Sequence, residues 1–175
     1  MILNYSTIKV IAFDCFGTVF DMSTLARDDI SGYVATSRDK HGEEWQPLNL
    51  SDAWYELRAH PDSAEGIRKL RRKFKVCTLS NGPFHLLEHI SRNAGLVWDL
   101  IIPIEMLKAY KRHPSTYLAV PSLFRVDPSE VLVVTANPGF GDVEAATQLG
   151  MQAVVIRDPL RAQYKNILAM AYALD

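Results

Sequence analysis

Residues 9–21, KVIAFDCFGTVFD, constrain the fold of this chain more than any other stretch. Residues 10–13 form a short apolar run, typical of a strand that is buried on both faces of a sheet. Asp14 ends this run, Gly17 permits a turn that bulkier residues resist, and Thr18 adds a hydroxyl just beyond it. Ligands of open α/β sheets bind outside the carboxyl ends of the strands, so the pattern indicates a site. On this stretch alone, a turn residue or helix N-cap is the alternative interpretation of Asp14.

Length and composition fit one globular domain, alone or with a small insertion. The chain has 175 residues, of which 48% are hydrophobic and 22% charged, enough for a full core. The net charge of −1 gives no overall reason to expect a nucleic-acid or membrane partner. The basic run at residues 68–73 fits the exposed face of a helix better than a binding patch. Without a secretory signal or an apolar run that could span a bilayer, we expect a cytoplasmic protein that acts on a small molecule.

The two cysteines, Cys15 and Cys77, lie in apolar, strand-like runs. Neither has the Cys or His spacing of a zinc site. We expect two reduced thiols in the core. A nucleophilic Cys15 is the alternative, although no histidine lies nearby in sequence to activate it.

Beyond residue 60, apolar runs alternate with segments of helical periodicity. Strands are expected at 74–79, 100–104, 131–134 and 153–156. Regular alternation of strands and helices predicts a parallel sheet with right-handed crossovers. The predicted fold is therefore α/β, a three-layer Rossmann-like sheet with helices on both faces.

One expected helix contains an unfavourable residue. It opens at Pro114 and contains Pro121, which predicts a kink or an early stop near Val120. Its apolar residues Leu118 and Leu123 are expected to face inward, along with Tyr117.

Residues 22–60 break the alternation and show no strand pattern. Ile30 and Val34 suggest one amphipathic helix and Trp54 a second, short one; an irregular loop is the alternative. We therefore expect a core domain made of residues 1–21 and 61–175, with residues 22–60 as a small helical cap. A cap this small leaves the site open, which is compatible with a large substrate or with a second subunit that covers it.

Polar residues recur where the expected strands end. Asp14, Ser80, Asn137 and Asp142 each follow an apolar run, and Lys111 lies in the loop after another. Because the carboxyl ends of parallel strands share one edge of the sheet, these side chains can converge there. Each is weak evidence alone, since caps, turns and surface charges use the same residues.

These motifs resemble those of the haloacid dehalogenase superfamily, and most closely its L-2-haloacid dehalogenase branch. The matching segments are IAFDCFGTVFD at 11–21, TLSNG at 78–82, AYKRHPSTY at 109–117 and NPGFGDVEAATQLGM at 137–151. The resemblance implies that Asp14 is a nucleophile that forms a covalent ester. It further implies that Lys111 offsets carboxylate charge and that Asp142 is the acid of the fourth motif. The groups implied to orient nucleophile and substrate, or to line the substrate site, are Thr18, Ser80, Cys15, Phe16, Asn81, Gly82, Tyr117 and Asn137.

Phe16 and Asn137 separate the chain from the phosphatases of this superfamily. Phosphatases carry an aspartate general acid where this chain has Phe16, which cannot move a proton, and often an acid where it has Asn137. The dehalogenase branch has an aromatic residue at the first place. We therefore expect a 2-haloacid dehalogenase without a cofactor. The alternatives are a phosphatase, with Mg²⁺ held by Asp14 and Asp142, and a non-catalytic binding protein of the same fold.

The short cap departs from the dehalogenases. Their insertion is much longer, and one of its helices supplies a halide-binding arginine. In this chain, Arg27 and Arg38 are candidates for that role by location alone.

Overall fold

The computed structural model describes residues 3–175 and has a four-stranded parallel sheet at its centre. The order is β4–β1–β5–β6, with β1 at Val10–Phe13, β4 at Lys75–Thr78, β5 at Val131–Thr135 and β6 at Gln152–Val155. β1 pairs with β4 on one side and β5 on the other, as expected for a central strand. Phe13, its last residue, is level with Thr78 and Val134, so the residues that follow these three strands meet at one edge.

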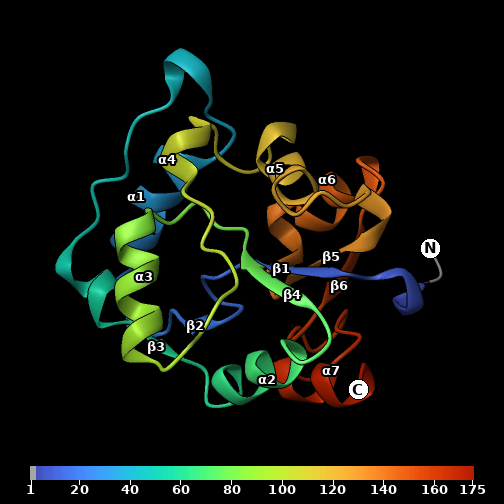
Figure 1. The fold of residues 1–175 in the computed structure, drawn as a ribbon. Helices are drawn as coiled ribbons and strands as arrows, with labels where there is room; N and C mark the ends of the chain where they lie inside the picture. The colour runs from blue at the N-terminus through green and yellow to red at the C-terminus, as the bar shows by residue number, and fades with distance from the viewer. Residues whose placement is uncertain (1–2) are drawn as a thin grey trace.

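Helices cover both faces of the sheet and confirm the three-layer prediction (Figure 1). Successive side chains of a strand point to opposite faces, so Ile11 and Phe13 enter one core cluster while Val10 and Ala12 enter the other. The first face is covered by α2 (Ser63–Leu70), α3 (Phe84–Asn93) and α7 (Ile167–Ala173). The second is covered by α5 (Pro114–Phe124) and α6 (Asp142–Gln148). Within residues 3–175, no helix is long and apolar enough to cross a membrane.

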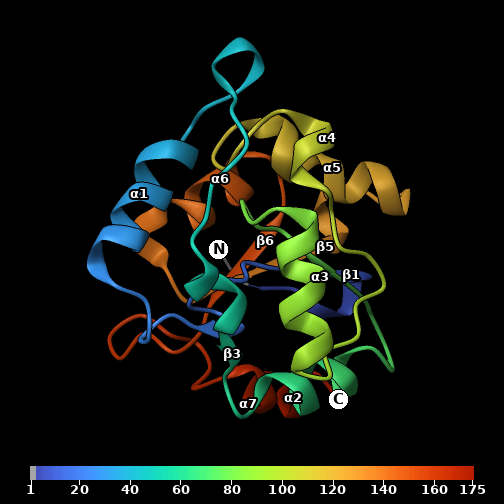
Figure 2. The same ribbon diagram turned by 90° about the vertical axis from the view of Figure 1, so that its left-hand side faces the viewer.

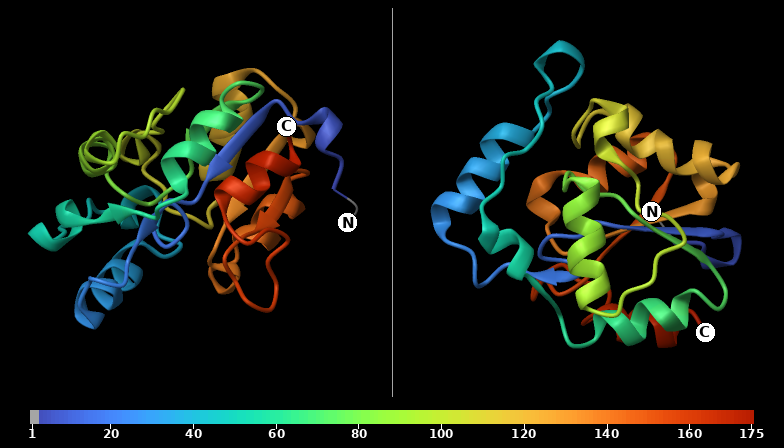
Figure 3. Two further views of the ribbon diagram at one scale, coloured as in Figure 1. Left: turned by 90° about the horizontal axis from the view of Figure 1, so that it is seen from below. Right: turned by 60° about the vertical axis from the view of Figure 1, so that its left-hand side comes forward.

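Residues 22–60 lie beside the edge where the strands end (Figures 2 and 3). They contain α1 (Arg27–Ser37), as expected, but the second segment is a 3-10 helix, η3 (Asp52–Glu56). The chain leaves and rejoins the core through a short antiparallel pair, β2 (Phe20–Asp21) and β3 (Arg58–Ala59). We propose that residues 1–21 and 61–175 form the core domain and residues 22–60 the cap, with the β2–β3 pair at the boundary between them. The remaining short elements are η1 (Tyr5–Thr7), η2 (Gly42–Glu44), α4 (Ile104–Leu107), η4 (Pro128–Glu130) and η5 (Pro138–Phe140).

The strand expected at residues 100–104 does not form. Leu100 makes a single bridge to Cys77, and the amide of Ile102 donates to the hydroxyl of Thr78 rather than to a strand carbonyl. Pro103 has no N–H to continue a ladder, so the segment turns into α4 instead.

The early stop expected near Val120 is wrong, because α5 continues through Pro121 to Phe124, while the expected kink stays a prediction. Tyr117 and Val120 are fully buried, and we attribute the tolerated loss of one helical hydrogen bond to this packing. Leu118 and Leu123 face outward, at 39% and 54% exposure, which corrects their expected inward orientation.

Asp62 and Arg157 form a partly buried ion pair at the start of α2. Arg157 contacts both carboxylate oxygens at 2.9 and 3.0 Å, and the amide of Ile167 donates to the same carboxylate at 2.9 Å. Arg157 also donates to the carbonyl of Thr18, so the pair supports the loop that follows Asp14. Burial alone would raise the pKa of Asp62, but the hydrogen bonds from Arg157 outweigh it and lower the pKa below its usual value.

Asp62→Asn is therefore expected to lower the free energy of unfolding near pH 7 by about 1–2 kcal/mol, allowing for partial solvent screening. The pKa of Asp62 is lower in the folded state than in the unfolded state. Its contribution to the free energy of unfolding is therefore present at pH values above the unfolded-state pKa and is lost as the pH falls through the folded-state pKa. Urea unfolding at several pH values should show the two proteins converging in acid. Asp52→Asn, at an exposed carboxylate, is the control and should show no such convergence. A difference that stays constant with pH would contradict the ion-pair explanation.

Candidate active site

Asp14 lies directly beyond β1, and its carboxylate is held by three side chains. Oδ1 is 2.8 Å from Nζ of Lys111. Oδ2 accepts hydrogen bonds from Oγ1 of Thr18 at 2.7 Å and from Nδ2 of Asn137 at 2.9 Å. The residue is 6% exposed, so a nearly buried carboxylate is fixed in one orientation at the carboxyl edge of the sheet.

The turn after Asp14 requires glycine. Gly17 has a φ of +82°, and a Cβ there would lie 3.1 Å from the amide of Asn137. This tight turn brings Thr18 back to Asp14, and the Thr18 hydroxyl also accepts from the amide of Ala136 at 2.8 Å. The loops after β1 and β5 are thereby joined around the carboxylate.

Lys111 lies between two carboxylates. Its ammonium is 3.1 Å from Oδ2 of Asp142, whose Oδ1 accepts from the hydroxyl of Tyr117 at 2.5 Å. Lys111 is 1% exposed; burial alone would lower its pKa, but Asp14 and Asp142 outweigh burial and raise the pKa well above its usual value. The lysine is therefore a fixed positive charge beside the nucleophile candidate. Burial also raises the pKa of Tyr117, so its phenol stays protonated and donates to Asp142.

The segment after β4 supports this network from the side. The hydroxyl of Ser80 accepts from the amide of Gly82 at 3.1 Å, and Oδ1 of Asn81 accepts from the amide of Lys111 at 2.7 Å. Nδ2 of Asn81 is buried and has no protein partner within residues 3–175. A Cβ on Gly82 would lie 2.8 Å from the ring of Phe16, so glycine lets the two segments pack closely. The structure thus places Asn81 against the backbone of Lys111 and Gly82 against Phe16, while the roles of Ser80, Asn81 and Gly82 stay predictions.

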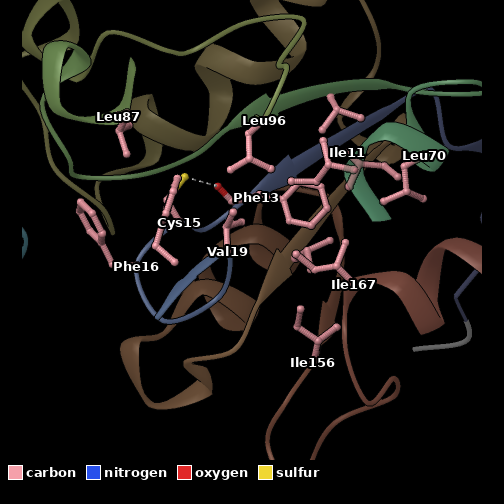
Figure 4. Close-up of a cluster of buried hydrophobic side chains, with 14 of the residues drawn as sticks. Ile11, Phe13, Cys15, Phe16, Val19, Leu70, Leu87, Leu96, Ile156 and Ile167 are labelled. Atoms are coloured by element: carbon pink, nitrogen blue, oxygen red, sulfur yellow. Dashed lines mark hydrogen bonds between the residues drawn. The ribbon is translucent and has the colours of Figure 1, made fainter. Parts of the chain in front are cut away.

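A cavity of about 120 Å³ adjoins Asp14. The residues that line it are Asp14, Phe16, Met22, Ile30, Tyr33, Val34, Lys111, Asn137 and Phe140. Cys15 does not contribute its side chain, because its thiol points into the hydrophobic core and lies 3.6 Å from the carbonyl of Phe13 (Figure 4). Burial raises the pKa of both cysteine thiols, in agreement with their expected place in the core. Any contact of Cys15 with a substrate must therefore come from its backbone.

Neither arginine proposed for halide binding lines the cavity. Arg27 is exposed at the start of α1. Arg38 is exposed as well, with its guanidinium 5.8 Å from the centre of the Phe140 ring. Five lining residues were not predicted as site residues: Met22, Ile30, Tyr33, Val34 and Phe140. Tyr33 falls between Ile30 and Val34 at helical spacing, a signal that could have placed it on the same face of α1.

The end of α1 is joined to the loop that carries Lys111. Backbone hydrogen bonds run from the amide of Asp39 to the carbonyl of Lys111, from Tyr110 to Lys40 and from Gly42 to Lys108, over 2.8–3.1 Å. Arg112 adds an ion pair with the carboxylate of Asp39. Residues 39–42 and 108–112 therefore form one connected unit, which we call the Lys111 clasp.

The carboxylates do not fit a magnesium site. All four oxygens of Asp14 and Asp142 already accept from Lys111, Thr18, Asn137 or Tyr117. The ammonium of Lys111 takes the position between the two acids that a shared cation would need. In the part of the chain that the structure describes, no group of three or more His, Cys, Asp or Glu side chains could hold a metal ion.

The sequence of this chain is similar to those of known dehalogenases. Residues 24–150 match the family of haloacid dehalogenase-like hydrolases. An (S)-2-haloacid dehalogenase of Xanthobacter autotrophicus is 35% identical, over 82% of this chain and 72% of that protein. The (S)-2-haloacid dehalogenase 4A of Burkholderia cepacia is 34% identical, over 68% of this chain but only 53% of that protein.

Solved structures agree in fold. A defluorinating L-2-haloacid dehalogenase superposes with a TM-score of 0.78 at 23% identity, covering 95% of each chain. The L-2-haloacid dehalogenase of Xanthobacter autotrophicus with chloropropionic acid covalently bound gives a TM-score of 0.69 at 24% identity, covering 95% of this chain and 88% of that one. On its family match and its identity to the first of these relatives, this chain belongs to the haloacid dehalogenase-like hydrolases.

Proposed function

We propose that the chain is a 2-haloacid dehalogenase acting on short 2-halocarboxylates. The observation that carries this proposal is the carboxylate of Asp14, held at the wall of a small cavity by a buried lysine. A nucleophile must be both oriented and accessible, and Asp14 meets both conditions. The two relatives that are 35% and 34% identical to this chain over the aligned residues are named for this reaction.

In the first step, an oxygen of Asp14 attacks the carbon that bears the halogen. A carbon–oxygen bond forms, the carbon–halogen bond breaks, and the bonding pair leaves with the halide. We expect Lys111, and backbone amides near Asn81 ahead of α3, to attract the substrate carboxylate. The product of this step is an ester of Asp14.

In the second step, water attacks the carbonyl carbon of that ester. Thr18 and Asn137 already donate to Oδ2 of Asp14, so they can stabilise the negative charge that develops on this oxygen. Asp142 is the other carboxylate of the network and can accept the proton of the water. Collapse of this adduct breaks the bond between the acyl carbon and the ester oxygen, the departing oxygen takes the proton from Asp142, and the 2-hydroxy acid is released. Loss of the remaining proton to water regenerates the carboxylate of Asp14.

The phosphatase alternative lacks support from the site. Phe16, whose ring lines the cavity, occupies the place where a phosphatase needs a general acid. The oxygens of Asp14 and Asp142 also already accept hydrogen bonds from protein donors, which disfavours Mg²⁺ there. We expect phosphomonoester hydrolysis to be slower by at least about 10²-fold than with such an acid.

A substrate panel tests this function. The protein should hydrolyse 2-chloropropionate and 2-bromopropionate at rates that EDTA does not change, and should leave alkyl phosphates nearly intact with or without Mg²⁺. Fast, Mg²⁺-dependent phosphate release would replace the dehalogenase proposal by the phosphatase. Binding of 2-halocarboxylates without any turnover would favour a non-catalytic protein.

A further inference from the structure

The cavity beside Asp14 has two walls of different character. One is formed by the core, where Asp14, Lys111 and Asn137 hydrogen-bond to one another. The other is formed by α1, which contributes Ile30, Tyr33 and Val34. Ile30 and Val34 carry no polar group, so Tyr33 is the lining residue of α1 whose side chain can offer a hydrogen-bond donor to the cavity.

The hydroxyl of Tyr33 has no assigned partner. No hydrogen bond joins the hydroxyl of Tyr33 to a residue between 3 and 175, and this oxygen is not among the fully buried atoms without a partner, so it is open to a ligand or to water. Its ring is fixed by an edge-to-face contact with Phe16 at 5.4 Å and by Trp54 at 5.0 Å, measured between centroids. A phenol held this firmly, without an acceptor, is a preorganised donor.

The charges of Lys111, Asp14 and Asp142 influence the pKa of the Tyr33 hydroxyl. Burial is the largest cause that raises the pKa of Tyr33; Lys111 acts to lower it, while Asp14 and Asp142 act to raise it. The phenol group therefore lies within the electrostatic field of the nucleophile and stays protonated at neutral pH.

Displacement at carbon places the leaving group opposite the attacking oxygen. With Asp14 on the core wall, the halide departs toward α1, and the charge it gains needs a donor there. Arg27 and Arg38 do not line the cavity. We propose that Tyr33 donates a hydrogen bond to the departing halide, in the dehalogenase reaction proposed above, on which this inference rests. The tyrosine keeps its proton, and the halide leaves with the electron pair of the broken bond.

Tyr33→Phe tests this role, since it removes the hydroxyl and keeps the ring. Single-turnover ester formation should be measured with 2-chloropropionate and 2-bromopropionate. Removing a donor to a developing charge should slow the chloride reaction by about 10- to 100-fold. The bromide reaction should slow less, because bromide is the better leaving group. The ratio of the two rates should therefore change, whereas a loss of folded protein would lower both rates equally.

Tyr55→Phe is the matched control, because it removes another cap hydroxyl, which bonds to His85 outside the cavity. It should leave both rates unchanged. An unchanged ratio of rates in Tyr33→Phe would overturn the role of Tyr33 while the dehalogenase proposal stands. A wild-type protein that forms no ester from either haloacid would overturn the proposed function and this inference together.

Discussion

Asp14→Asn is expected to lower dehalogenation by more than about 10⁴-fold, the order lost when a hydrolase loses its nucleophile. An amide oxygen is a poor nucleophile, and the Nδ2 group of the new side chain has no acceptor where Thr18 and Asn137 now donate. The folded state should survive this mismatch. Steady-state halide release and thermal melting should be measured on the same sample.

Isotope incorporation decides whether the carboxylate is the attacking group. One turnover of the wild-type protein in ¹⁸O water should label Asp14, because water attacks the carbonyl carbon of the ester. Mass spectrometry of the peptide containing Asp14 reads this directly. Label confined to the hydroxy acid would mean that water attacks the substrate itself, and the covalent route would be wrong.

Lys111→Met is expected to abolish activity and to lower the free energy of unfolding by about 3–5 kcal/mol near neutral pH, as when one partner of a buried ion pair is removed. Methionine keeps the apolar stem but leaves Asp14 and Asp142 facing one another without a cation. In the wild type, the pKa of Lys111 is higher in the folded state than in the unfolded state. Its contribution to stability is therefore fully present at pH values below the unfolded-state pKa, and it is lost only as the pH rises through the folded-state pKa. The variant should therefore differ from the wild type across the whole neutral range.

The double variant Lys111→Met, Asp142→Asn separates charge from packing. Removing the second carboxylate should restore part of the stability without restoring activity. Urea unfolding of the wild type, Lys111→Met, Asp142→Asn and the double variant forms a complete cycle. Equal stability of Lys111→Met and the wild type would show that the lysine does not compensate the two acids.

The sheet was predictable because apolar runs and the polar residues that end them are local signals. Residues 100–104 are the segment for which this signal failed, although they are as apolar as the strands that do form. Whether an edge segment joins a sheet depends on its backbone hydrogen bonds, and Pro103 has no N–H to donate one. Likewise, helical periodicity could not reveal that α5 passes through Pro121, since that depends on the packing of Tyr117 and Val120.

The core wall of the site was predictable and the cap wall was not. Asp14 and Asn137 follow β1 and β5, which the sheet brings together, so their order along the chain was sufficient. Lys111 reaches the same edge although the strand expected before it does not form. Tyr33 reaches the cavity through the path of residues 22–60, which no local pattern determines. A buried tyrosine on an amphipathic helix looks the same in sequence whether it faces a core or a substrate.

The Lys111 clasp has a consequence for how substrate enters and product leaves. Since residues 39–42 are hydrogen-bonded to residues 108–112, a swing of the end of α1 away from the sheet would pull on Lys111 as well. A hinge motion that exposed Asp14 would then also move Lys111 away and leave the negative charge of Asp14 without its positive partner. Substrate entry and product release therefore cost the least free energy when a lining side chain rotates and the backbone of the cap does not move. Phe140, which lines the cavity and packs against the exposed Arg38, is such a side chain.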